Sequence, residues 1–354
     1  MAWTPKNGRT TCARRFGVDL GMKAIVPGFA HLLETGHVVH PLHDAERTWP
    51  QTNCSVDLLV ELLNAYGFEP LWMLAFTVTQ DFEGDHFTFF KVPGEDLEAL
   101  YGLSIQELAV WDDLQGHIIE QLQRGRVVLL EVDGYFLPDT LGVTYHERHG
   151  KTTIGIYGLD PEQRRLDYFH NETRGSLTDT DFDGALQRLP TQAGRLMPYA
   201  ELLKPVGTPH KNPAALALQQ LRHHWQRRPA ENPFRAYARV FPEHIEKLKA
   251  RGPGYFHDYA FNTLRQTGAN FGLLDSFLTA LPGDEFGPAA ACALSLADAA
   301  KTLQFQLARA VARNRFDTLG AAIDCMADTY DNLMEELGRT ATLADLQPAA
   351  TTSP

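Results

Sequence analysis

The sequence predicts an α+β protein, with helices and an antiparallel sheet in its first part and an α-helical bundle in its second. Two observations support this fold class. Up to about residue 200, short apolar or alternating runs bounded by Gly and Pro are typical of strands. From about residue 210, apolar residues recur at spacings of three and four, and no strand signal interrupts them. The predicted domains are 1–205 and 210–338, followed by a small, polar tail at 339–354 that is expected to be disordered.

The first part begins its regular structure with a helix that follows a polar run. From Ser55 apolar residues recur at helical spacing, and Gly67 and Pro70 end the pattern. Further helices are predicted at 95–101 and 112–124. Strands are predicted at 85–92, 126–136, 152–160 and 164–171, and a strand or buried turn at 71–78.

The second part is predicted to contain only helices. One starts after Pro213, and long amphipathic stretches follow at 257–281, 286–314 and 317–337. In the last stretch, apolar residues alternate between spacings of four and three, which is typical of a packed helical seam.

Composition excludes several classes of protein. The 354 residues carry a formal net charge of −12, which argues against general nucleic-acid binding. No apolar run approaches the ~20 residues that a membrane helix needs. The four cysteines form no CxxC pair, so neither a zinc knuckle nor a disulfide scaffold is indicated. Arg14 and Arg15 resemble a twin-arginine signal, but Asp19 and Lys23 interrupt the segment after it, so a cytoplasmic location with reduced thiols is expected.

Cys54 stands where the polar run becomes the first helix. Backbone N–H groups and the helix dipole favour a thiolate at such a position, and the same N–H groups can hold an oxyanion. Cys54 is therefore a candidate nucleophile, although most cysteines outside disulfides are simply small buried apolar residues. Gln51 and Asn53 are candidates to complete an oxyanion hole, or equally to cap the helix.

A thiol nucleophile needs a base, and the base needs an orienting partner. His149 precedes the predicted strand at 152–160, and the next strand carries Asp167 and ends at Asn171. Because paired ends of antiparallel strands bring side chains within reach, we predict His149 as the base, oriented by Asp167 or Asn171. A cysteine at a helix start, followed by His and Asn or Asp on a sheet, is the papain-like arrangement.

Longer motifs carry a more specific resemblance. The segments EPLWMLAFTVTQDFEGDHFTFFK, LPDT, HGKTTIGI and YFHN resemble a bacterial family of the domain-of-unknown-function 1839 type, over most of 30–190 and more weakly over the helical half. That family often accompanies amino acid:carrier protein ligases related to seryl-tRNA synthetase. The helix-opening cysteine, the segment from Asp133 to Pro138 and the hairpin distantly resemble the butirosin-biosynthesis acyl-carrier-protein:aminoglycoside acyltransferase, whose N-terminal domain is C39-peptidase-like (papain-like).

The resemblance implies a papain-like (C39-peptidase-like) N-terminal domain and a cysteine-dependent acyltransferase. An aminoacyl group would pass from a carrier-protein phosphopantetheine thioester to Cys54 and then to a small amine acceptor. The enzyme itself would bind no cofactor, and its partners would be the loaded carrier protein and the ligase. A papain-like peptidase or thioesterase, and a non-catalytic scaffold that binds carrier proteins, are the alternatives.

The sequence departs from the papain-like pattern at the histidine. Thr152 holds the position where that pattern usually has its histidine, and His149 stands three residues earlier. His146 and His170 are therefore alternative bases.

Charge is unevenly distributed along the chain. Residues 54–133 hold fifteen acidic and three basic residues, a stretch that would attract a cationic amine, whereas 222–251 hold eight basic and three acidic residues. Since carrier proteins are usually acidic around their pantetheine serine, the basic segment is predicted to dock one. A solvated helix face is the alternative for both segments. The predicted docking residues are Arg222, Arg227, Arg228, Arg235 and Arg239.

A histidine-rich segment precedes Cys54. It contains His37, His40, His43 and Asp44 but lacks the HExxH spacing of a helical zinc site, and Pro41 argues against a regular helix. We predict a polar loop there and no metal.

Overall fold

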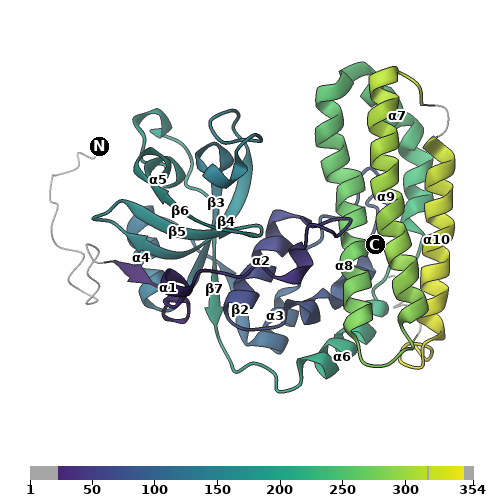
Figure 1. Cartoon of the computed structure of the whole chain (residues 1–354), viewed down its shortest axis with the longest axis horizontal. Coiled ribbons are helices and arrows are strands. Elements are labelled where there is room, and N and C mark those ends of the chain that lie inside the picture. The colour runs from purple at the N-terminus through teal and green to yellow at the C-terminus, as the bar shows by residue number, and fades with distance from the viewer. Residues whose placement is uncertain (1–22, 317–318, 347–354) are drawn as a thin grey trace, which may run out of the picture. The chain divides into compact units, whose positions relative to one another are not determined.

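The computed structural model describes residues 23–316 and 319–346, which form two compact units (Figure 1). The first unit contains the described residues up to 38 together with Ser104–Pro205, and the second contains Val39–Leu103 and the described residues from Val206 onward. The expected domains were contiguous along the chain. The structure differs because residues 39–103 cluster with the helical half, so the helix that opens at Cys54 and the sheet belong to different units.

The first unit is built on a seven-stranded sheet in the order β2-β7-β3-β4-β5-β6, with β1 paired to β4. β3 pairs with β4 and β7, and β5 pairs with β4 and β6, all in antiparallel orientation. This arrangement confirms a mixed α and β fold with an antiparallel sheet. The strands are β1 (Ala24–Ile25), β2 (Leu103–Glu107), β3 (Val127–Asp133), β4 (Lys151–Asp160), β5 (Arg165–His170), β6 (Thr173–Thr178) and β7 (Ala200–Pro205).

The strands with the strongest apolar patterns form the middle of the sheet. Nearly all residues of β3, β4 and β5 are buried, which explains the apolar runs from which these strands were predicted. The strands β1, β2, β6 and β7 are short or partly exposed, and they were not predicted. Helix α4 (Leu114–Gln123) packs on β1, β3 and β4 through the fully buried Ile118, Ile119 and Leu122. The shorter elements of this unit are η2 (Pro27–Phe29), α1 (Leu32–Thr35), η5 (Gly134–Phe136), η6 (Pro138–Thr140), α5 (Asp179–Ala185) and η7 (Pro190–Gln192).

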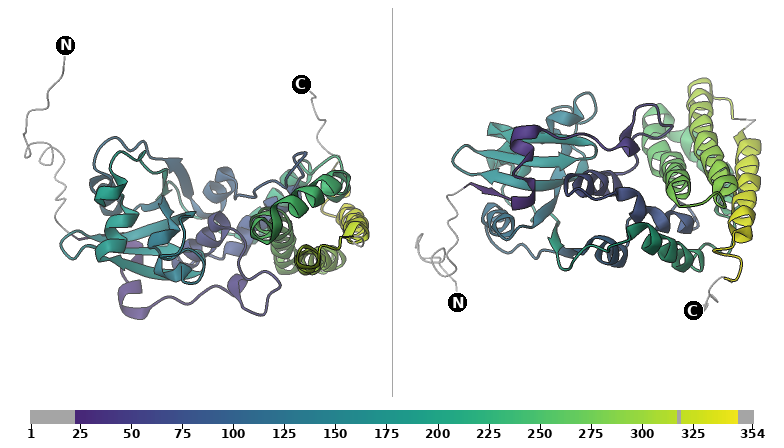
Figure 2. Two further views of the ribbon diagram at one scale, coloured as in Figure 1. Left: turned by 90° about the horizontal axis from the view of Figure 1, so that it is seen from above. Right: turned by 60° about the horizontal axis from the view of Figure 1, so that its bottom comes forward.

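The second unit consists of helices among its described residues. The long helices are seen nearly end-on in the left view of Figure 2, where they pack side by side as a bundle. This confirms the predicted helical region. The elements are η3 (Pro41–His43), α2 (Cys54–Ala65), η4 (Pro70–Thr79), α3 (Gly94–Tyr101), α6 (Pro213–Trp225), α7 (Pro233–Ala260), the π-helix η8 (Phe261–Arg265), α8 (Gln266–Ala280), α9 (Gly287–Arg313) and α10 (Leu319–Arg339).

Three local predictions differ from the structure. Residues 71–78, predicted as a strand or a buried turn, form no strand and belong to the buried 3₁₀ helix η4, which Pro70 begins and in which two Thr hydroxyls donate to carbonyls three residues earlier. Residues 85–92 contribute only an isolated bridge between Phe82 and Phe87. In the expected disordered tail, Leu343 is fully buried within a series of turns, while 347–354 lie outside the described residues. The Arg14–Arg15 motif also lies outside them.

Candidate functional site

Cys54 is the first residue of α2, and the residue before it fixes the start of this helix. The buried Asn53 accepts hydrogen bonds from two N–H groups of the first turn through its Oδ1, both at 3.0 Å. Its Nδ2 donates to the Phe90 carbonyl at 3.0 Å. Of the two roles open to Asn53, the structure therefore shows the helix cap. Cys54 itself is partly buried, and Gln51 is exposed.

Two buried carboxylates follow Cys54 on the same side of α2. Asp57 and Glu61 are 1% and 0% exposed. They share His43, whose Nδ1 lies 2.6 Å from Glu61 Oε1 and whose Nε2 lies 3.4 Å from Asp57 Oδ1. Burial alone would lower the pKa of His43, but the hydrogen bonds and charges of Asp57 and Glu61 outweigh it and raise that pKa to about 9. A pKa raised in this way favours the imidazolium form of His43 beside the two carboxylates.

Sequence reasoning missed this cluster. The available signal was a pair of carboxylates at i and i+4 inside an otherwise apolar helix, where neither faces water. The neighbouring segment completes the contacts: Thr52 donates to Asp57 through its N–H and its hydroxyl, and the His40 N–H donates to Glu61 at 3.0 Å. Within the described part of the chain, no group of three His, Cys, Asp or Glu side chains is arranged to hold a metal ion.

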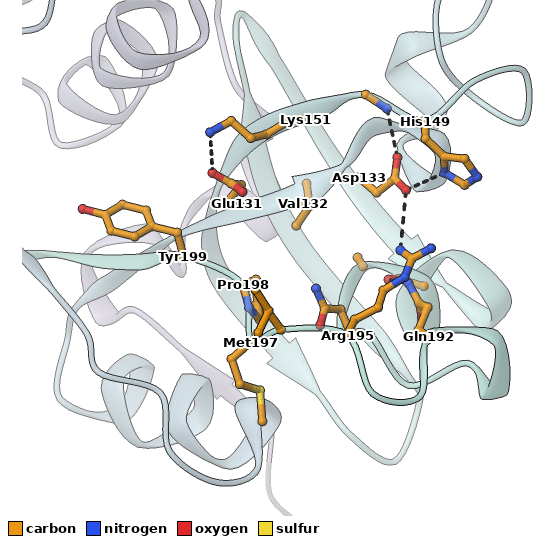
Figure 3. Close-up of a pocket in the computed structure, with 15 residues that line it drawn as sticks. Glu131, Val132, Asp133, His149, Lys151, Gln192, Arg195, Met197, Pro198 and Tyr199 are labelled. Carbon is orange, nitrogen blue, oxygen red and sulfur yellow. Dashed lines mark hydrogen bonds and ion pairs between the residues drawn. The ribbon is translucent and has the colours of Figure 1, made fainter.

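His149 lies just before β4, and a carboxylate at the end of β3 holds it (Figure 3). Its Nδ1 lies 2.6 Å from Asp133 Oδ2, and the Gly150 N–H donates to the other oxygen of the same carboxylate at 3.2 Å. The imidazole stacks on Tyr135 with ring centroids 4.8 Å apart, and the His149 side chain is 66% exposed. A carboxylate at Nδ1 favours the tautomer that keeps Nε2 as a proton acceptor, which is the geometry of an oriented base.

Asp133 and His149 line an open pocket of about 570 Å³ in the first unit. Figure 3 shows strands β3 and β4 on one side of it and the segment 195–199 on another. An ion pair of Lys151 with Glu131 at 2.8 Å lies on the strands, and Arg195 approaches Asp133 to 4.0 Å. The exposed Leu196 and Met197 add an apolar rim. The pocket therefore combines charged groups with apolar surface and is open to solvent.

Neither of the two residues predicted to orient His149 forms a hydrogen bond with it. Asp167 pairs opposite Gly158, far along β4 from His149. Asn171 occupies the two-residue turn between β5 and β6 with a left-handed φ of 48°, a conformation that Asn tolerates better than most residues. The orienting partner is Asp133 instead, because β4 has β3 as its other neighbour and Asp133 pairs opposite Lys151, close to His149.

Thr152, which holds the usual papain-like histidine position, is reached by an imidazole from the adjacent strand. Its Oγ1 lies 2.8 Å from Nε2 of His170, and Nδ1 of His170 is hydrogen-bonded to Asp139. His170 is only 4% exposed, so these contacts tie β4 to β5 inside the unit. The third histidine, His146, is exposed and lies 3.2 Å from a carboxylate oxygen of Asp181.

The predicted pairing of Cys54 with His149 joins residues of different units. Cys54 belongs to the second unit and His149 to the first. Each unit supplies the local geometry that its residue needs, namely a capped helix start and a carboxylate-held imidazole. The pairing itself stays a prediction.

All five predicted docking arginines contact residues of their own unit. Four have acidic partners and one stacks on an aromatic ring: Arg222 with Asp345, Arg227 with Glu95, Arg235 with Asp328 and Asp331, Arg239 with Glu231, and Arg228 over Trp225. These carboxylates offset most of the positive charge of the arginines. The net charge counted over 222–251 therefore overstates the positive charge that a docking partner would meet. Exposed pairs are weak and can exchange partners. Docking of an acidic carrier at these residues stays a prediction.

Comparison with known proteins identifies the family. The model of the DUF1839 N-terminal domain matches residues 38–205, and the model of the DUF1839 C-terminal domain matches residues 210–339. The first match contains Cys54, Asp133 and His149, and the second contains the five arginines. No curated protein matches the sequence. No described helix is long and apolar enough to cross a membrane. With both family domains matched in order over most of its length, the chain belongs to the DUF1839 family.

Proposed function

We propose that this protein is a cysteine-dependent acyltransferase that moves an aminoacyl group from a carrier protein to an amine. The Cys54 sulfur attacks the carbonyl of the phosphopantetheine thioester, and the bond to the pantetheine sulfur breaks as that sulfur leaves and takes up a proton. The amine nitrogen then forms an amide bond, the C–S bond to Cys54 breaks, and the base returns the amine proton to the thiolate. One thioester and one amine are consumed, and one amide and one thiol are produced.

The observation that carries the proposal is the hydrogen bond between His149 and Asp133 at the pocket. An exposed imidazole held by a carboxylate is reachable by substrate and is already oriented, whereas His170 is enclosed. Cys54 adds a thiol at the capped start of a 12-residue helix, where the helix dipole supports a thiolate. Nucleophile, base and orienting carboxylate are the three roles that acyl transfer needs.

The order of Cys54 and His149 along the chain is that of papain-like enzymes, whereas Asp133 precedes the histidine instead of following it. A cysteine opens a helix, and a histidine then precedes a strand of an antiparallel sheet. We extend the proposal to a papain-like relationship, to a cytoplasmic location, and to the loaded carrier protein and its amino acid:carrier protein ligase as partners. The phosphopantetheine arm belongs to the carrier, so the proposal assigns no cofactor to this chain.

Replacing His149 is expected to slow acylation of Cys54. His149→Ala removes the base and should lower the rate about 10²- to 10⁴-fold, since that is the usual contribution of general base catalysis. Asp133→Asn should cost less, because the imidazole remains while its orientation weakens. The rates are measured by intact mass after the protein is mixed with an aminoacyl-loaded carrier protein. His146→Ala is the matched control, because His146 is also exposed and lies near a carboxylate, and it should acylate at the normal rate.

The same measurement separates the competing functions. A stable acyl group on Cys54 that an added amine removes as an amide supports the transferase. Release of the acyl group to water alone would identify a thioesterase or peptidase instead. A protein that binds the carrier but is never acylated would be a scaffold, and equal rates for His149→Ala and the unmodified protein would exclude His149 as the base.

A further inference from the structure

The residues just before Cys54 run along helix α8 inside the second unit. We call residues 47–53 the strap. Three of its contacts are with residues 265–272: the Arg47 guanidinium donates to the Gly272 carbonyl at 3.1 Å, the Trp49 ring packs against Gly268, and the Thr52 carbonyl accepts from Arg265 Nε at 3.1 Å. From Arg47 to Thr52 the strap approaches Cys54, while the residues that it contacts decrease in number from 272 to 268 to 265, which are intervals of four and three residues. That spacing places them on one side of the helix.

The last of these contacts lies at a π-helix. Arg265 is the final residue of η8, and Gln266 is the first residue of α8. Gln266 Oε1 lies 3.5 Å from Nδ2 of Asn53, so Arg265 and Gln266 face the two residues that precede Cys54. Single π-turns are rare and often occur at functional sites, because the extra residue turns the following side chains to a new direction.

The Arg265 guanidinium also brings a positive charge to the start of α2. Thr52 is two residues from Cys54, and two residues span at most about 7 Å, so the charge lies close to the Cys54 backbone. Arg265 also interacts with Lys301, whose pKa is lowered by burial first and then by this guanidinium. A cation near a helix N-terminus adds to the favourable field for a thiolate. Asp57 and Glu61 oppose that field, and the charged His43 offsets one of them.

We infer that Arg265 is a positioning residue for Cys54. Arg265 holds the end of the strap, and its charge stabilises the Cys54 thiolate. The inference deepens the proposed function and rests on it, since Cys54 is the nucleophile there. It assigns a role to the C-terminal family domain, which contains Arg265: that domain fixes the start of the nucleophile helix. It also gives a physical reason for the clustering of residues 39–103 with the helical half.

The test compares Arg265→Met with Arg265→Lys in the full-length protein. Alkylation of each cysteine by iodoacetamide is followed by peptide mass spectrometry, and Cys292 and Cys325 serve as internal references. Arg265→Met should slow alkylation of Cys54 about tenfold, since it removes one charge at short range, and leave the references unchanged. Arg265→Lys keeps the charge and should retain most of the rate. Thermal unfolding of both variants separates this effect from a loss of fold.

A pair of glycines provides a second, matched test of the strap. A Cβ added to Gly268 would lie 2.7 Å from the Trp49 ring and must displace it, whereas one added to Gly272 meets its neighbours at ordinary distances of 3.7 and 3.8 Å. Both glycines lie inside α8, so replacement by alanine has the same effect on helix propensity. Gly268→Ala should change the alkylation rate of Cys54 several-fold, and Gly272→Ala should leave it unchanged.

Two outcomes would overturn the inference. The first is that Cys54 alkylates in Arg265→Met as fast as in the unmodified protein, and the second is that the Lys and Met variants lose the same amount of rate. Alkylation needs no acyl donor, so this result is independent of the acyl-transfer assay. A slow Arg265→Met variant in a protein that is never acylated would support the positioning role and refute the proposed function.

Discussion

Replacing Cys54 with serine is expected to abolish acyl transfer and preserve the fold. The change is nearly isosteric, and the Asn53 cap that fixes the start of α2 does not involve the Cys54 side chain. A serine hydroxyl at a site that favours a thiolate is a far weaker nucleophile, so the rate should fall at least about 10³-fold. The measurement is intact mass after incubation with a loaded carrier protein, with circular dichroism as the check of folding.

The other cysteines provide the controls for this prediction. Cys292 and Cys325 lie in the second turns of α9 and α10 and open neither helix, and burial raises the pKa of Cys292. Their replacement by serine should leave transfer intact. The same is expected for Cys12, which lies outside the described residues. Full transfer by the Cys54→Ser variant would contradict the proposed nucleophile, even if His149 proved essential.

The second large effect is expected in the pH dependence of stability. The pKa of His43 is about 9 in the folded protein and near 6.5 in an unfolded chain. Since the folded state binds this proton more tightly, the stabilisation is fully present below pH 6.5 and disappears as the pH rises through 9. Its size is about 3 kcal/mol. Chemical denaturation of the unmodified protein should therefore give a lower free energy of unfolding at pH 9.5 than at pH 6.

His43→Gln is the variant that isolates this effect. It removes the titrating group and the positive charge that faces Asp57 and Glu61, so the variant should be several kcal/mol less stable at pH 6 and show a flatter pH dependence. His86→Gln is the matched control, because His86 also pairs with a carboxylate but is exposed. If His43→Gln and the unmodified protein lose the same free energy between pH 6 and 9.5, the buried imidazolium does not stabilise this unit.

The helix that opens at Cys54 could be predicted from the sequence because its signals are local. Apolar spacing after Ser55 and the stop at Gly67 define α2, and the buried runs define β3, β4 and β5. The partner of His149 was predicted incorrectly because the chain order favoured β5, the next strand, over β3. Asp133 precedes His149 by 16 residues, and only the pairing of β3 with β4 brings the two together.

By itself, the sequence determined the α and β classes of the two parts, the start of α2 at Cys54, and the family to which the chain belongs. Tertiary structure alone decided which carboxylate holds His149, that Asp57 and Glu61 enclose a charged His43, and that residues 39–103 cluster with the helices. The physical reason is that periodicity and capping act over three or four residues, so they are readable along the chain. Hydrogen bonds between strands, buried ion pairs and the strap along α8 join residues 14 to more than 200 positions apart, and no local pattern records them.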